Sequence, residues 1–229
     1  VKAAEQAVKA AQDALNEALA DDFITPEEMA ELEKARDDAQ VKLDDAQSKV
    51  DALPGSEAKT GLEERLEALE NITLGTVEGE DDFNQDVKDA VDNYDKAADG
   101  AEKALNDAKE AVKAAEEELA AGLADDTLTE EELSDLVGKV TDAQNALNTA
   151  KDAINELPPS DKKDVLTGEL AGEQEKLDLV EAEAAVKAAE QAVKAAQDAL
   201  NEALADDFIT PEEMTELEKA RNDAQAKLD

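Results

Sequence analysis

The sequence predicts an all-α protein in which tandem, elongated three-helix bundles form a rod, with one long continuous helix joining the later repeats. Three observations support this prediction. Residues 1–44 recur as residues 186–229 with only three differences, and a more distant copy lies between them. Apolar residues recur in alternating steps of three and four, the spacing of one helix face. Each copy also carries the same signal for the start of a second helix.

The composition excludes several classes of function. The 229 residues include 62 acidic and 23 basic side chains, for a net charge of -39, and there is no Cys, His or Trp. Without thiol or imidazole groups the chain has no ordinary zinc or copper ligands, no thiol nucleophile and no imidazole base. We therefore expect no enzyme activity and no catalytic, cofactor-binding or metal site. The strong negative field also disfavours nucleic acid and anionic membrane surfaces as partners.

Composition alone is typical of disorder, because low hydropathy with high net charge usually leaves too little apolar surface to bury. The repeated apolar pattern indicates a folded chain instead. No apolar run approaches the length of a membrane span, so we expect no membrane insertion. The first residues do not resemble a signal peptide, and the last copy stops within a repeat. We expect a fragment of a larger protein.

The repeats predict the domain organisation. Residues 105–160 share 23 of 56 positions with residues 1–56. The matching residues Thr25, Thr129 and Thr210 are 104 and then 81 residues apart, so the repeat unit is about 81 residues long. We expect a first three-helix repeat over 1–75, an acidic linker over 76–85, a second repeat with an extended first helix over 86–180, and a truncated third repeat over 181–229.

The first helix of each repeat carries one apolar stripe. Its members are Val1, Ala4, Val8, Ala11, Leu15 and Ala18 in the first copy and Leu105, Ala108, Val112, Ala115, Leu119 and Gly122 in the second. The second helix begins at a capping box. Thr25 is placed at the N-cap, Pro26 at the first helical position, and Glu28 where its side chain returns a hydrogen bond. The equivalent pairs are Thr129 with Glu132 and Thr210 with Glu213.

Hydrophobic staples are expected beside these caps, from Ile24 with Met29, Leu128 with Leu133, and Ile209 with Met214. The second helix continues with apolar residues at Leu32, Ala39, Leu43, Ala46, Val50 and Leu53. Prolines after position 53 and after position 157 end this helix. Ser56 and Ser160 then cap a third helix. Its expected core residues are Leu62, Leu66 and Leu69 in the first copy, and Val165, Leu166 and Leu170 in the second.

The two junctions between repeats differ. Residues 168–204 contain no Pro, so the third helix of the second repeat is expected to continue into the first helix of the third. Residues 71–79 break the helix between the first two copies. A helix is expected from 86 to 122, with the apolar stripe extended backwards through Val87, Val91, Tyr94, Ala98 and Ala101. Its leading half, 86–100, must pack either on the third helix of the first repeat or on another chain.

Few residues are candidates for a specific site. The pairs Asp21-Asp22, Asp125-Asp126 and Asp206-Asp207 resemble part of a calcium loop, but Leu19 stands at a ligand position and Asp22 where glycine is needed. We expect solvated carboxylates there, with only loose, non-specific binding of divalent cations at 78–82. Asn71-Ile72-Thr73 matches a glycosylation sequence that is frequent by chance. Arg36 is expected to extend to solvent from the apolar stripe, and Tyr94 to lie in the core or an interface.

The chain resembles the GA-like and FIVAR-type three-helix repeats of large bacterial cell-surface adhesins and biofilm-associated, matrix-binding-like proteins. The resemblance rests on three segments: Val8-Lys9-Ala10-Ala11, then residues 20–28, then Leu53-Pro54-Gly55-Ser56. It implies a tandem segment of a secreted fibrous protein, extracellular and exposed at a bacterial surface, with a role in attachment or aggregation. Some relatives bind serum albumin or matrix proteins, but no binding residues can be carried over to this sequence.

The leading functional hypothesis is a non-catalytic spacer segment in attachment, aggregation or biofilm formation. The alternative is a module that binds a host protein such as albumin or a matrix component. A third hypothesis is a cytoplasmic spectrin-like scaffold. Like molecules on neighbouring cells are further candidate partners. A binding face predicts exposed apolar residues shared by every copy, whereas a spacer constrains only the apolar stripe and the caps.

Overall fold

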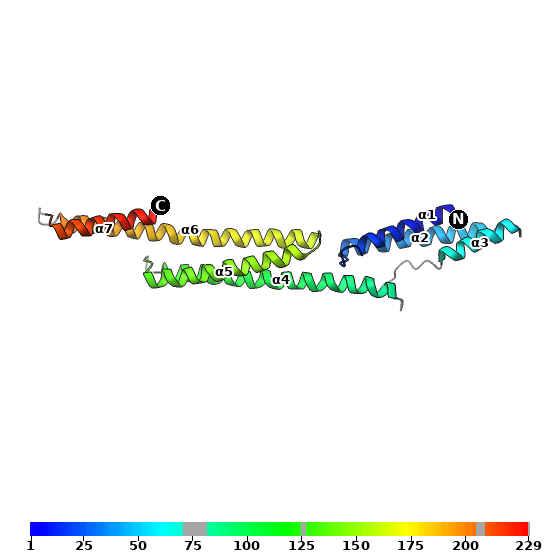
Figure 1. The fold of residues 1–229 in the computed structure, drawn as a ribbon, viewed down its shortest axis with the longest axis horizontal. Helices are drawn as coiled ribbons and strands as arrows, with labels where there is room; N and C mark the ends of the chain where they lie inside the picture. Colours follow the sequence, from blue (N-terminus) through cyan, green and yellow to red (C-terminus); the bar gives the residue numbers. More distant parts are fainter. Residues whose placement is uncertain (71–81, 125–126, 205–208, 229) are drawn as a thin grey trace. The chain divides into compact units, whose positions relative to one another are not determined.

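The computed structural model describes residues 1–70, 82–124, 127–204 and 209–228 (Figure 1). Within these ranges the chain forms seven helices and no strand, which confirms the predicted all-α class. The helices are α1 (Lys2–Ala18), α2 (Pro26–Asp51), α3 (Glu57–Glu70), α4 (Asp82–Gly122), α5 (Glu130–Glu156), α6 (Asp161–Ala203) and α7 (Pro211–Leu228). None of the helices in the described ranges has a stretch long and apolar enough to cross a membrane.

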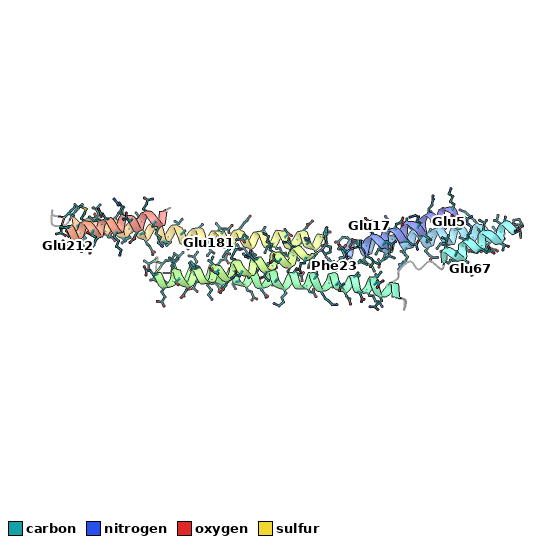
Figure 2. All side chains as sticks on the ribbon, in the orientation of Figure 1. Glu5, Glu17, Phe23, Glu67, Glu181 and Glu212 are labelled. Atoms are coloured by element: carbon teal, nitrogen blue, oxygen red, sulfur yellow. The ribbon has the colours of Figure 1, made fainter. Side chains whose placement is uncertain are left out.

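The described residues divide into two compact units. Unit 1 consists of Val1–Gly100 and Asn155–Lys163, and unit 2 of Ala101–Ile154 and Asp164–Asp229. The expected boundaries of the three repeats remain a prediction. In both units charged side chains cover the outer helix faces, as Glu67, Glu181 and Glu212 illustrate (Figure 2). The helices therefore place an apolar stripe inward and their carboxylates in water.

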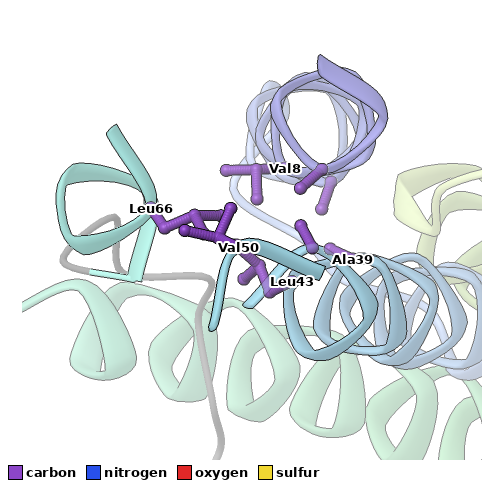
Figure 3. Close-up of a cluster of buried hydrophobic side chains, with 8 residues drawn as sticks. Val8, Ala39, Leu43, Val50 and Leu66 are labelled. Atoms are coloured by element: carbon purple, nitrogen blue, oxygen red, sulfur yellow. The ribbon is translucent and has the colours of Figure 1, made fainter. Parts of the chain in front are cut away.

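The core of the first hairpin is small and built largely from alanine. Val8 and Ala39 face each other across α1 and α2, and Leu66 of α3 closes the cluster with Leu43 and Val50 (Figure 3). The predicted stripe of α1 is confirmed, since its residues from Ala4 to Ala18 are at most 5% exposed. Alanine lets the helix backbones approach closely but buries little apolar area per residue.

Two residues that were predicted to lie in the core, Leu53 and Val165, are exposed. Leu53 is 42% exposed because α2 ends at Asp51 and the chain turns, with the Leu53 N–H donating to the Val50 carbonyl at 3.0 Å. Val165 is 57% exposed, whereas its neighbour Leu166 is only 4% exposed. Adjacent apolar residues on a helix lie about 100° apart, so only one of the two faces the core.

Both predicted long helices are present, and α4 begins earlier than predicted. α6 has 43 residues, about 64 Å at 1.5 Å per residue, which confirms a continuous helix into the third copy. α4 has 41 residues and begins at Asp82, four residues before the predicted start at position 86. In its first turns the Gln85 side-chain amide donates to the Asp89 carboxylate at 2.7 Å, an i,i+4 pair that favours the earlier start.

All three predicted capping boxes are present. In α2 the Glu28 N–H donates to the Thr25 hydroxyl at 3.1 Å, and the Thr25 N–H donates to the Glu28 carboxylate at 2.9 Å. The boxes at Thr129 and Thr210 have the same bonds. Bonds from Thr210 lower the pKa of Glu213 below its ordinary value. Ionised Glu213 therefore stabilises the folded chain. This contribution is fully present above the pKa that Glu213 has in the unfolded chain, and it is lost as the pH falls through the lower pKa of the folded chain.

Replacing Thr129 by Ala is expected to destabilise the start of α5 by about 1 kcal/mol, because the N–H of Glu132 then loses its acceptor. Amide hydrogen exchange of the first turn of α5 measures the change. Thr149→Ala is the matched control, since Thr149 is an exposed residue inside α5 whose hydroxyl donates to its own helix. Equal effects of the two substitutions would contradict a role for the cap.

Candidate functional site

The best-defined cluster outside the bundle core lies where the α1–α2 loop meets α4. Leu15, Ala18 and Ile24 pack against Val87 and Ala90, and all five are buried. The leading half of α4 therefore packs within the chain, on the loop end of the first hairpin. The expected partner within the chain, the third helix of the first repeat, is wrong, because the residues of this cluster come from α1, the α1–α2 loop, α2 and α4 and none from α3.

Polar groups fix this contact at the loop. The Ile24 N–H donates to the carbonyl of Ala90 at 3.3 Å, and the Asn93 side chain donates to the carbonyl of Asp22 at 3.3 Å. Asp22 has φ of 64°, a left-handed conformation that aspartate tolerates better than most residues. A largely apolar groove of about 330 Å³ lies beside the contact, between Met29 and α4. The loop is thus held on α4 by one backbone hydrogen bond and one hydrogen bond from the side chain of Asn93.

Tyr94 has a structural role in unit 1. Its ring is 3% exposed and its hydroxyl lies 3.3 Å from the Ser160 hydroxyl. Ser160 in turn donates to the Pro158 carbonyl and accepts from the N–H of Lys163, which confirms it as the cap of α6. The expectation of a core or interface residue is confirmed, whereas the partner of Tyr94 was not predicted.

The carboxylates of the α1–α2 loop serve the local chain. Asp21 accepts from the N–H of Phe23 at 3.2 Å, the bond of a tight turn around an aspartate. In the part of the chain that the structure describes, no group of three or more acidic side chains is arranged to hold a metal ion. The candidates at 71–73, 78–81, 125–126 and 206–207 lie outside the described residues. Arg36 is half-buried and reaches Asp37 at 3.0 Å, as expected for an extended head group.

An ion pair recurs in two copies with its charges exchanged. Arg65 of α3 pairs with Glu5 of α1, and 104 residues later Glu169 of α6 pairs with Lys109 of α4 at 2.7 Å. Both pairs join the first and third helices of a repeat at equivalent positions. Counting identical residues between the copies misses this ion pair, because neither residue is conserved between them. A comparison of charges finds it, since the charge is reversed at both positions after a shift of 104 residues.

Exchanging the charges in the first copy is expected to be tolerated. Glu5→Lys or Arg65→Glu alone is expected to cost about 0.2 to 1 kcal/mol, because the pair is largely exposed. The double variant is expected to regain most of that loss, as the second copy already has this polarity. Urea unfolding of unit 1 in a double-mutant cycle measures the coupling. Additive losses would show that the two side chains do not interact.

Exposed apolar residues are not shared among equivalent positions of α2, α5 and α7. Val41 is 62% exposed, but Asn145 and Ala226 stand in its place in the other copies. Val137 is 57% exposed, but the other copies have glutamate there. A contact face repeated in every copy would require the opposite pattern.

Comparison with known proteins gives one match. A family model described as a GA-like domain matches residues 1–90 and 179–229, which is more than half of the chain. The first match includes α1 to α3 and ends at Ala90, the residue of α4 whose carbonyl accepts from Ile24. No curated protein and no solved structure matches the chain.

Proposed function

Because this chain belongs to the GA-like domain family, we propose that it is a non-catalytic spacer segment of a secreted bacterial surface protein. GA-like domains are typical modules of such surface proteins. In this proposal the segment lies outside the cell, as part of a larger protein, and projects other regions in attachment, aggregation or biofilm formation. Its helices supply length, and its carboxylates keep neighbouring molecules apart.

The observation that carries the proposal is α6. This helix supplies the third helix of one repeat and the first helix of the next without a break. Bending it between repeats would break several consecutive backbone hydrogen bonds, so a continuous helix is a stiffer connection than a loop. The absence of shared exposed apolar positions on the second helices favours a spacer over a repeated contact face.

Spin labels on α6 test the mechanical part of this proposal. The chain has no native cysteine, so Val165→Cys with Asp198→Cys gives two unique sites, both exposed on α6. We expect one narrow distance distribution near about 50 Å, the span of 33 helical residues. Ala185→Pro is expected to broaden the distribution, since proline breaks the helix between the labels. A broad distribution in the parent chain would argue against a stiff spacer.

The second candidate function is binding of a host protein such as albumin or a matrix component, and family membership favours it. The immobilised chain, exposed to serum and solubilised matrix at physiological salt with and without millimolar calcium, separates the two. A spacer predicts only weak, salt-sensitive retention of basic proteins. A single saturable partner that persists at higher salt would support the binding module instead.

A further inference from the structure

The residue before each of the first two capping boxes bonds to a helix that lies far along the chain. Ile24 precedes the box of α2, and its N–H donates to the Ala90 carbonyl of α4 at 3.3 Å. Leu128 precedes the box of α5. In the amide orientation that satisfies both groups, Gln191 of α6 accepts from the Leu128 N–H and donates to the Leu128 carbonyl at 3.0 Å. Ile24 and Leu128 are both buried, and a buried N–H needs such a partner.

The two contacts are equivalent in the sequence although their chemistry differs. Val87, which packs in one cluster with Ile24 and Ala90, lies 104 residues before Gln191. The same offset relates Ile24 to Leu128 and the first copy to the second. An apolar side chain covers the first site and an amide covers the second. Residues 87–90 of α4 and the turn of α6 around Gln191 are called here the covering turns.

Each covering turn belongs to the helix that continues into the following copy. α4 runs from residues 87–90 into the apolar stripe of the second copy without a break. Gln191 lies within residues 186–203, which are identical to residues 1–18 and form the first helix of the third copy. The GA-like match over residues 1–90 extends past α3 and includes the first covering turn. The cover of each copy is therefore supplied by the next copy's helix.

We propose that each covering turn holds the preceding capping box closed, so that two consecutive copies open together at this point. Separating residues 87–90 from the first loop would expose Leu15, Ala18 and Ile24, which are now at most 5% exposed. A coupling free energy is reciprocal, so loosening the loop also frees the covering turn. Nearest-neighbour coupling of this kind makes a repeat array cooperative. The proposal goes beyond the spacer role and does not depend on it.

The coupling is expected to be stronger at the first copy than at the second. Thr25, the first N-cap, is only 2% exposed, whereas Thr129 is exposed and its bonds compete with water. The first covering turn also buries apolar side chains, because Val87 and Ala90 are each 3% exposed. At Leu128 the cover includes a polar amide that bonds to the backbone.

Amide hydrogen exchange of the full chain, followed by NMR, tests the second contact. Gln191→Ala removes the acceptor of the Leu128 N–H. Exchange of the N–H groups of Leu128, Glu132 and Leu133 is expected to become at least about tenfold faster, since the start of α5 opens with the loop. Gln6→Ala is the matched control, because it makes the same change in an identical local sequence and Gln6 is exposed. It is expected to leave the start of α5 unchanged.

Val87→Ala tests the first contact in the same way. The N–H groups of Ile24, Glu28 and Met29 are expected to exchange at least about tenfold faster, and by a larger factor than at α5. Val41→Ala is its control, since Val41 is 62% exposed.

Two results would overturn the proposal. Faster exchange confined to the N–H of Leu128 or of Ile24 would show the loss of one contact without coupling to the capping box. Unchanged exchange at the start of α5 in Gln191→Ala, or at the start of α2 in Val87→Ala, would show that the box closes by itself. Neither result bears on the distance measured along α6 in the spin-labelled chain, so the spacer proposal is tested separately.

Discussion

Replacing Leu66 by alanine is expected to lower the free energy of unfolding of unit 1 by about 2 to 5 kcal/mol. Leu66 is 1% exposed and is the only fully buried residue of α3. Its side chain closes a cluster otherwise made of Val8, Leu43, Val50 and four alanines, and the alanines have little bulk with which to fill a cavity. Urea unfolding followed by NMR signals from α3 and α1 measures the loss within unit 1.

Leu179→Ala is the control for this substitution. Leu179 is 69% exposed on α6, so its truncation is expected to change stability by no more than about 0.5 kcal/mol. Because the chain has two compact units, the signals of each unit are fitted separately. If Leu66→Ala were as mild as Leu179→Ala, the small cluster would not be what holds α3 on the hairpin.

The features that the sequence predicts well are local and periodic. A capping box needs only residues three apart, and Thr25 with Glu28 supplies every atom of it. The apolar stripe of α1 needs only the repeat of the helix, so Ala4 and Val8 are placed inward without knowledge of their partners. The long α6 follows from the absence of proline and glycine breaks near its middle.

Partners distant in the sequence are less predictable. The stripe of α4 shows that Val87 and Tyr94 must be covered, but periodicity alone does not show what covers them. The contacts from Ile24 to Ala90 and from Tyr94 to Ser160 span more than 60 residues each. They depend on where the α1–α2 loop and the chain at the start of α6 each meet α4 in unit 1.

Leu200 and Ile209, which are exposed, also show that periodicity does not identify what covers an apolar surface. Identical residues are buried in one copy and exposed in another, so their pattern specifies a surface to be covered and not its cover. The exchanged ion pair adds a related point. The positions of Glu5 and Arg65 keep their interaction although neither residue is kept in the second copy.

Raising NaCl from about 0.01 M to about 0.5 M is expected to increase the melting temperature by about 4 to 8 °C, or about 1 to 2 kcal/mol. With 62 acidic and 23 basic side chains, carboxylate repulsion outweighs the exposed ion pairs that salt also weakens. Calorimetry at a low, fixed protein concentration, where the chain is monomeric, measures the change. The screening length falls from about 30 Å to a few ångströms over this range, so most of the increase is expected below about 0.3 M. A steady rise continuing to molar salt would indicate stronger apolar burial instead, and a flat response would show that the carboxylates are already too far apart to repel.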